Sequence, residues 1–198
     1  MSIRIVTDST ADIPVEIANK LNIRVVPLNV HFGQSTFKDG IDLTTDNFFD
    51  KLIQGPHFPS TSQPSIGDFM EAYKPIIEKG DEIISIHISS KLSGTTNSAI
   101  QAAEQLKDDG NIAVVDTLQA SLTVGLTAMA AAKAVLEGKV FQEVVDLAKS
   151  TSDRAELFAL LDTLEYLEKG GRIGKARALV GGLLKIKPLI TIMDGEVG

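Results

Sequence analysis

Short apolar runs rich in β-branched residues alternate along this chain with longer segments whose apolar residues recur at helical spacing. Because this alternation is typical of βαβ units, it predicts an α/β fold with a parallel sheet. Several runs are apolar at successive positions, as in Ile112-Ala113-Val114-Val115, which indicates strands covered on both faces and therefore a three-layer arrangement. The predicted strands are residues 3–7, 24–30, 82–88, 112–116, 156–161 and 188–193.

The predicted helices are marked by their ends and by their apolar faces. Pro14 fits the first turn of one helix, Thr44 precedes another, and Ser65 followed by Asp68 predicts a capping box. From Ser65 onward the apolar residues follow a period of 3.6, so this helix is expected to turn one face to the core. That face consists of Ile66, Phe69, Met70, Tyr73, Ile76 and Ile77.

A break in the alternation divides the chain into two predicted units. The helical pattern ends near residues 150–153, and a new strand-like run follows. We therefore predict an N-terminal α/β domain over residues 1–152 and the beginning of a second α/β domain over residues 153–198. The chain stops at Asp194-Gly195-Glu196-Val197-Gly198, which is typical of a hairpin turn soon after the last strand. The second unit is therefore expected to be truncated.

Composition narrows the classes of function. The hydrophobic share of 43% and the charged share of 23% are those of an ordinary globular domain. A formal net charge of -7 argues against nucleic acid or an anionic membrane as partner, because either needs a basic patch. The chain has no cysteine, which fits a reducing compartment, so we expect it in the cytoplasm. Residues 118–136 are largely apolar, but Gln119 and Lys133 interrupt them, so they predict a buried helix and no stable membrane insertion.

Two loops rich in hydroxyl groups carry the candidate chemistry. One is Thr61-Ser62-Gln63-Pro64, and the other is Ser89-Ser90-Lys91-Leu92-Ser93-Gly94-Thr95-Thr96, which follows a predicted strand and opens a helix. In parallel sheets ligands bind where the carboxyl ends of the strands gather. Gly94 permits close backbone approach, and the helix beginning near Thr95 points its partial positive end at this place. The loops therefore predict a site for an anion or a carboxyl group.

Several residues near this edge allow two interpretations. Asp8, Ser9, Asp116 and Thr117 follow predicted strands and either contribute to the site or cap the following helices. Arg172, after Gly170-Gly171, either pairs with a carboxylate or phosphate or is a solvated residue beyond a glycine helix cap.

Catalytic signals are weak. The chain lacks the Gly-x-Ser-x-Gly nucleophile motif and a Walker motif, and its three histidines, His31, His57 and His87, have no metal-site spacing. We therefore predict no catalytic residue, metal or cofactor. An enzyme that acts on a small anionic substrate at the same sheet edge, with Asp8 and Ser93 in catalytic roles, stays open as the alternative.

Several short motifs, taken in order along the whole chain, resemble the DegV family. The motifs are Thr7-Asp8-Ser9-Thr10-Ala11-Asp12, Val26-Pro27-Leu28, Asp39-Gly40, Thr61-Ser62-Gln63-Pro64, Ser89-Ser90-Lys91-Leu92-Ser93-Gly94-Thr95, Leu164-Glu165-Tyr166-Leu167-Glu168-Lys169-Gly170-Gly171-Arg172-Ile173 and Ile186-Lys187-Pro188. The resemblance implies a protein that binds a long-chain fatty acid and presents it to a separate fatty acid kinase subunit with a dihydroxyacetone-kinase-like domain. It also implies that the chain is not itself an enzyme and has no ATP site.

The resemblance also implies roles for individual residues. Thr61 and Ser93 hold the carboxyl group, with Arg172 close by, and the acyl chain lies in an apolar tunnel formed largely by the second domain. The full predicted substrate-binding set is Thr61, Ser62, Ser93, Gly94, Thr95 and Arg172. Members of the family usually continue beyond this C-terminus and include a histidine near the carboxyl group, which this sequence lacks. Phe37 stands where relatives often have tyrosine.

Overall fold

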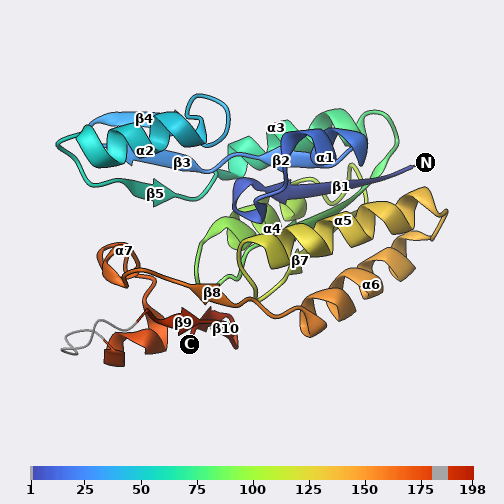
Figure 1. The fold of residues 1–198 in the computed structure, drawn as a ribbon. Coiled ribbons are helices and arrows are strands. Elements are labelled where there is room, and N and C mark those ends of the chain that lie inside the picture. The colour runs from blue at the N-terminus through green and yellow to red at the C-terminus, as the bar shows by residue number, and fades with distance from the viewer. Residues whose placement is uncertain (1, 180–186) are drawn as a thin grey trace.

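The computed structural model describes residues 2–179 and 187–198 and contains a central sheet of parallel strands (Figure 1). The strand order is β2-β1-β6-β7, so the order of the strands reverses between β1 and β6. The α/β class with a parallel sheet is thereby confirmed. The strands are β1 (Ile3–Asp8), β2 (Arg24–Val26), β6 (Glu82–His87) and β7 (Ile112–Asp116).

Helices cover both faces of this sheet, as the apolar strands predicted. Along β1 the side chain of Ile5 packs into one core cluster, and that of the next residue, Val6, packs into the other. Ile84 and Ile83 of β6 divide between the two clusters in the same way. The layers are formed by α3 (Ile66–Ile77) and α4 (Thr95–Gln105) on one face, and by α1 (Val15–Lys20), α5 (Leu122–Leu136) and α6 (Phe141–Arg154) on the other.

The predicted helix signals are confirmed in α3 and α5. Ser65 forms the capping box of α3, because its backbone N–H donates to Asp68 Oδ2 at 2.7 Å and its Oγ accepts from the Asp68 N–H at 3.1 Å. Phe69 and Tyr73 of the predicted core face are fully buried. The alanine-rich helix α5 lies in the core beside the sheet. Among residues 2–179 and 187–198, none of the helices has the length and apolar composition that crossing a membrane would need.

The predicted strand over residues 24–30 is wrong, because the segment is divided between two sheets. Strand β2 ends at Val26, and Pro27 cannot donate the N–H that a continuing strand would need. The chain then forms β3 (Asn29–Phe32), which starts a second, antiparallel sheet.

This second sheet has the order β4-β3-β5, and the sequence pattern did not predict its outer strands. The strands β4 (Ser35–Lys38) and β5 (Ser60–Ser62) are short, so their alternation is weak. The helix α2 (Thr45–Gln54) covers one face, where Phe48 packs on Val30 and Phe32.

The C-terminal strands are shorter than predicted. Strand β8 (Ala159–Leu160) pairs with β9 (Leu189–Ile190), and β10 (Ile192–Met193) pairs with β11 (Glu196–Val197). The predicted run 188–193 is therefore split between two pairs. Asp194 and Gly195 have φ values of 52° and 83° between β10 and β11, which confirms the predicted hairpin turn.

The C-terminal strands share a small core of their own. Ile173, Ile190, Ile192 and Val197 pack together there, with Leu92 of the N-terminal unit against them. A short helix α7 (Glu165–Lys169) and a 3-10 helix η2 (Gly174–Leu179) belong to the same region, and another 3-10 helix, η1 (Ser9–Ala11), follows β1. The division between residues 152 and 153 stays a prediction; α6 ends two residues later, at Arg154.

Candidate functional site

The loop between β6 and α4 folds into a tight turn that brings hydroxyl groups to the start of α4. The N–H of Ser93 donates to the carbonyl of Ser89 at 3.1 Å, which curls the loop back on itself. Ser93 Oγ lies 2.9 Å from Thr95 Oγ1 and accepts from the Thr95 N–H at 3.3 Å. The N-cap position itself is Gly94, which offers no side chain. Ser93 is partly exposed and Thr95 is buried, so of these two hydroxyl groups that of Ser93 is the nearer to solvent.

Strand register separates the two hydroxyl residues of β5. Thr61 is paired with Val30, and Ser62 is paired with Asn29, so their side chains lie on opposite faces of the sheet. Thr61 lies on the face covered by α2, in the wall of a cleft. Ser62 Oγ instead contacts His31 Nε2 at 2.9 Å on the other face. The predicted site residues Thr61 and Ser62 therefore face different surroundings.

The two hydroxyl-rich loops meet at Gly94 and Gln63. A Cβ atom added at Gly94 would lie 2.8 Å from Nε2 of Gln63, so a larger residue there would displace the end of that side chain. The loop of β5 therefore reaches the start of α4, a proximity that the sequence could not establish. Gln63 was in the predicted loop but not among the predicted site residues.

Arg172 lies against the same loop. Its Nε donates to the carbonyl of Leu92 at 3.2 Å, and its Nη1 donates to the carbonyl of Gly170 at 2.7 Å. Gly170 is also the C-cap of α7, as the glycine-cap interpretation predicted, and Leu92 directly precedes Ser93 in the hydroxyl loop. The guanidinium group is planar and has five N–H donors. An anion beside Leu92 could accept from those N–H groups that do not already donate to the carbonyls of Leu92 and Gly170.

An apolar cleft of about 930 Å³ lies between α2, the segment that enters β5, and α7. Its wall includes Thr61 and Arg172. On one side Phe58 stacks on Tyr166 with ring centroids 5.8 Å apart, and the ammonium group of Lys169 lies 5.0 Å from the Phe58 centroid. The apolar wall residues are Phe48, Phe49, Leu52, Ile53, Phe58, Pro59, Tyr166 and Leu167.

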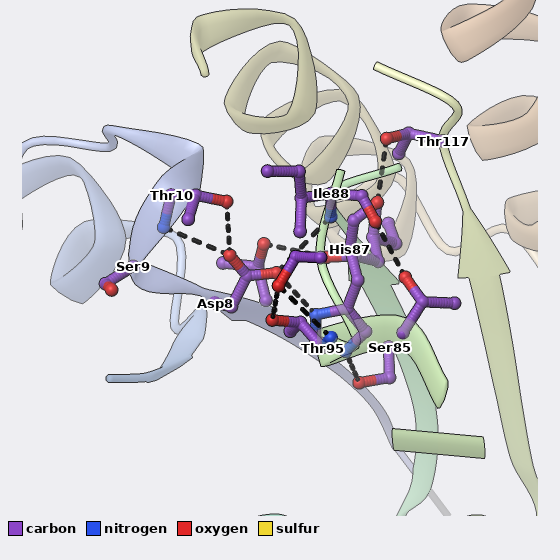
Figure 2. Close-up of polar contacts among 12 residues, drawn as sticks. Asp8, Ser9, Thr10, Ser85, His87, Ile88, Thr95 and Thr117 are labelled. Carbon is purple, nitrogen blue, oxygen red and sulfur yellow. Dashed lines mark hydrogen bonds and ion pairs between the residues drawn. The ribbon is translucent and has the colours of Figure 1, made fainter. Parts of the chain in front are cut away.

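A buried, hydrogen-bonded pair of Asp8 and His87 lies next to the start of the hydroxyl loop, and the sequence pattern did not identify it (Figure 2). Asp8 at the end of β1 accepts from Nδ1 of His87, at the end of β6, over 2.8 Å, and both side chains are 0% exposed. Asp8 also caps η1 by accepting from the Thr10 N–H at 3.0 Å, so the capping interpretation was correct. Burial raises the pKa of Asp8, but the hydrogen bonds from His87 and Thr10 outweigh burial and hold it below its ordinary value.

The other three strand-end residues also tie segments together, and Ser9 Oγ accepts from the N–H of Leu28 at 3.1 Å. Asp116 accepts from the N–H groups of Ser90 at 3.2 Å and Leu118 at 3.0 Å. Thr117 Oγ1 donates to the carbonyl of His87 at 2.7 Å. Within the described residues, no three side chains of His, Asp or Glu gather as they would around a metal ion.

The chain is similar to known proteins along nearly its whole length. A family model described as "Uncharacterised protein, DegV family" matches residues 2–198. A DegV domain-containing protein from Deinococcus radiodurans is 42% identical over 197 residues, which are 100% of this chain and 69% of that relative. The match to a DegV domain-containing protein from Staphylococcus aureus is 39% identical and covers 98% of this chain and 68% of the relative.

Solved structures of similar proteins superpose over the whole chain. The fatty-acid-binding DegV family protein from Thermus thermophilus gives a TM-score of 0.90 at 41% identity, with 100% of this chain and 70% of that chain covered. The DegV fatty acid binding protein from Bacillus subtilis gives a TM-score of 0.88 at 32% identity, with 100% and 70% covered. With the family model matching nearly every residue and relatives above 30% identity, this chain belongs to the DegV family.

Proposed function

We propose that this protein binds a long-chain fatty acid with its carboxyl group at Thr61 and Ser93, beside Arg172, and with its acyl chain in the cleft between α2 and α7. The observation that carries the proposal is that Thr61 and Arg172, two predicted head-group residues, line the same apolar cleft. The related proteins from T. thermophilus and B. subtilis, described as fatty-acid-binding, support the choice of ligand.

The acyl chain would provide most of the affinity. Each methylene removed from water contributes about 0.8 kcal/mol, so a dozen buried methylenes would contribute roughly 10 kcal/mol before the entropic cost of binding. In the C-terminal core Ile173, Ile190 and Ile192 pack against one another, whereas the α2–α7 cleft is open and apolar. The acyl chain is therefore assigned to the cleft.

The head group needs hydrogen-bond partners when it leaves water. The hydroxyl groups of Thr61 and Ser93 can each donate to a carboxylate oxygen, and the start of α4 adds the partial positive charge of a helix N-terminus. Arg172 would complement the negative charge. Gly94 and Thr95 shape the same turn, whereas Ser62 contacts His31 on the other face of the sheet and would only hold the β5 loop in place.

The proposal includes presentation of the bound acid to a separate kinase subunit with a dihydroxyacetone-kinase-like domain. A carboxylate that is hydrogen-bonded by hydroxyl groups keeps free oxygen lone pairs, and one of these can attack the phosphorus atom of a phosphoryl donor. In this role the chain positions the nucleophile, and the partner provides ATP. The alternative of a small-substrate enzyme is disfavoured because Asp8, its intended catalytic acid or base, is fully buried and already paired with His87.

Organic extraction of the purified protein followed by mass spectrometry tests the ligand directly. We expect a long-chain fatty acid in the extract, and saturable binding of the same acid to the delipidated protein. A protein without extracted acyl ligand that also failed to bind added fatty acid would refute the proposal. Phosphorylation of the bound acid by an added kinase subunit with ATP tests the second part separately.

Replacing Ser93 by alanine is expected to weaken fatty-acid binding about tenfold, because a buried carboxyl oxygen loses a partner worth about 1 to 3 kcal/mol. Titration of the delipidated variant measures the loss. Ser90→Ala is the matched control, since Ser90 lies in the same loop, is exposed, and is tied to Asp116 through its backbone N–H. Equal affinities of the two variants would remove Ser93 from the head-group site.

A further inference from the structure

A chain of buried hydrogen bonds runs from α3 through β6 to the end of β1. The hydroxyl of Tyr73 donates to Ser85 Oγ at 2.7 Å, Ser85 Oγ lies 2.6 Å from His87 Nε2, and His87 Nδ1 lies 2.8 Å from Asp8 Oδ2. All four residues are 0% exposed. The chain lies at the reversal of strand order between β1 and β6, where ligands of parallel sheets commonly bind.

The direction of the hydrogen bonds determines where the protons are. Ser85 Oγ accepts from Tyr73, and its contact with His87 Nε2 continues the chain of hydrogen bonds. Because a carboxylate can only accept, His87 Nδ1 carries a proton and donates it to Asp8.

Asp8 accepts hydrogen bonds from two segments, the residues after β1 and the end of β6. Besides His87, its carboxylate accepts from the N–H and the hydroxyl of Thr10 and, over 3.4 Å, from the N–H of Ile88. Two carboxylate oxygens that receive four donors require the ionised form. Asparagine at this position would offer a single acceptor oxygen, so a donor on one side would face its NH₂ group.

The order Ser85–His87–Asp8 is that of a hydrolase triad, yet nucleophilic catalysis does not follow from it. Ser85 is fully buried, its oxygen already accepts from Tyr73, and Phe69 packs edge-on against the His87 ring with centroids 5.0 Å apart. A substrate could not reach this hydroxyl without opening the core. Ser85, His87 and Asp8 therefore hold neighbouring segments of the fold in place and do not contact a substrate.

The neighbouring residue Ile88 lies at the start of the loop that carries Ser93. Ile88 donates its N–H to Asp8 and accepts at its carbonyl from Thr96 Oγ1 at 2.7 Å, so the two sides of the Ile88 residue are both fixed (Figure 2). The carbonyl of His87 accepts from Thr117 Oγ1 at 2.7 Å. The start of the hydroxyl loop is thereby held from β1, from α4 and from the end of β7.

We infer that Asp8 is a positioning residue for the head-group site, and that as a carboxylate paired with His87 it fixes the start of the Ser93 loop. The inference rests on the proposed function, because Ser93 is assigned to the head group there. Asp8 does not touch the ligand in this proposal and acts through its hydrogen bonds with Ile88 and Thr10. Substitution of Asp8 is therefore expected to lower the affinity more than substitution of Tyr73, which is equally buried at the other end of the hydrogen-bond chain.

The experiment compares two ends of the same buried chain in the delipidated protein. Asp8→Asn is expected to weaken fatty-acid binding about tenfold, whereas Tyr73→Phe, which removes one hydroxyl near α3, changes affinity by less than about twofold although it lowers thermal stability. Thr10→Val removes one donor to Asp8 with little change of shape, and is expected to weaken binding even if Asp8→Asn does not fold. Equal affinity losses in the Asp8 or Thr10 variant and in Tyr73→Phe would overturn the positioning role.

Nitrogen NMR of ¹⁵N-histidine-labelled wild-type protein tests the proton assignment without any substitution. We expect a proton on His87 Nδ1, and a ring protonated on Nε2 alone would overturn the assignment. The outcomes also separate this inference from the proposed function. A wild-type chain that binds no fatty acid rejects the function, whereas normal wild-type binding with unchanged affinity in Asp8→Asn and Thr10→Val rejects the positioning role alone.

Discussion

Replacing Ile53 by aspartate is expected to reduce fatty-acid affinity about a hundredfold, which corresponds to about 3 kcal/mol. Ile53 lies on α2 in the wall of the cleft and is 78% exposed, so an acyl chain would cover it on binding. The change removes apolar contact and places a charge where a methylene chain would exclude water. Because the side chain is exposed without ligand, the fold should tolerate the substitution.

Leu126→Asp is the matched control for this prediction. Leu126 is a similarly exposed leucine, at 54%, on α5 and outside the cleft. Titration of both delipidated variants with a long-chain fatty acid, alongside thermal unfolding, separates a lost contact from a damaged fold. Wild-type affinity in Ile53→Asp would place the acyl chain elsewhere, such as in the C-terminal unit that the family resemblance implies.

Replacing Gly125 by alanine is expected to destabilise the protein by about 3 kcal/mol, because overpacking a close backbone contact forces the backbone to move. A Cβ atom at this position would lie 2.3 Å from the carbonyl oxygen of Ala11 and 3.1 Å from Cγ1 of Ile13. Helix α5 therefore lies directly on η1 and on the residues after it, and only glycine permits that approach. For a chain of this size the melting temperature should fall by roughly 10 °C.

Gly67→Ala provides the contrasting substitution. Gly67 lies in α3, and the nearest atom to an added Cβ is Ser65 Oγ at 3.5 Å, which is an ordinary contact. Alanine there should raise the stability by about 0.5 to 1 kcal/mol through its better helix propensity. Thermal or urea unfolding of the two variants measures the difference. Similar melting temperatures would mean that α5 can move away from η1 at little cost.

Much of the N-terminal fold follows from local pattern. Continuous apolar residues in runs such as Ile112-Ala113-Val114-Val115 predicted strands covered on both faces, and the two core clusters confirm it. Ser65 and Asp68 predicted the start of α3, because a capping box involves residues only three positions apart. The turn at Asp194-Gly195 followed from the preference of these residues for positive φ.

The predicted strands were wrong where the structure depends on which strands pair with one another. Residues 24–30 have the composition of one strand, but Pro27 ends pairing with β1 and Asn29 pairs with β5. The segment 188–193 was likewise divided between two pairs of strands. A propensity pattern contains no information about which strand a segment will meet, and short strands add little periodicity.

For the candidate site, the sequence by itself determined the chemistry: two loops rich in hydroxyl groups, a glycine at a helix start and an arginine after paired glycines. These features are local, since each depends on a few adjacent residues. Only the tertiary structure decided that Thr61 faces the apolar cleft while Ser62 faces His31, that Arg172 meets Leu92, and that Asp8 pairs with His87. Such pairs are distant along the chain, and strand order and register alone determine whether they meet.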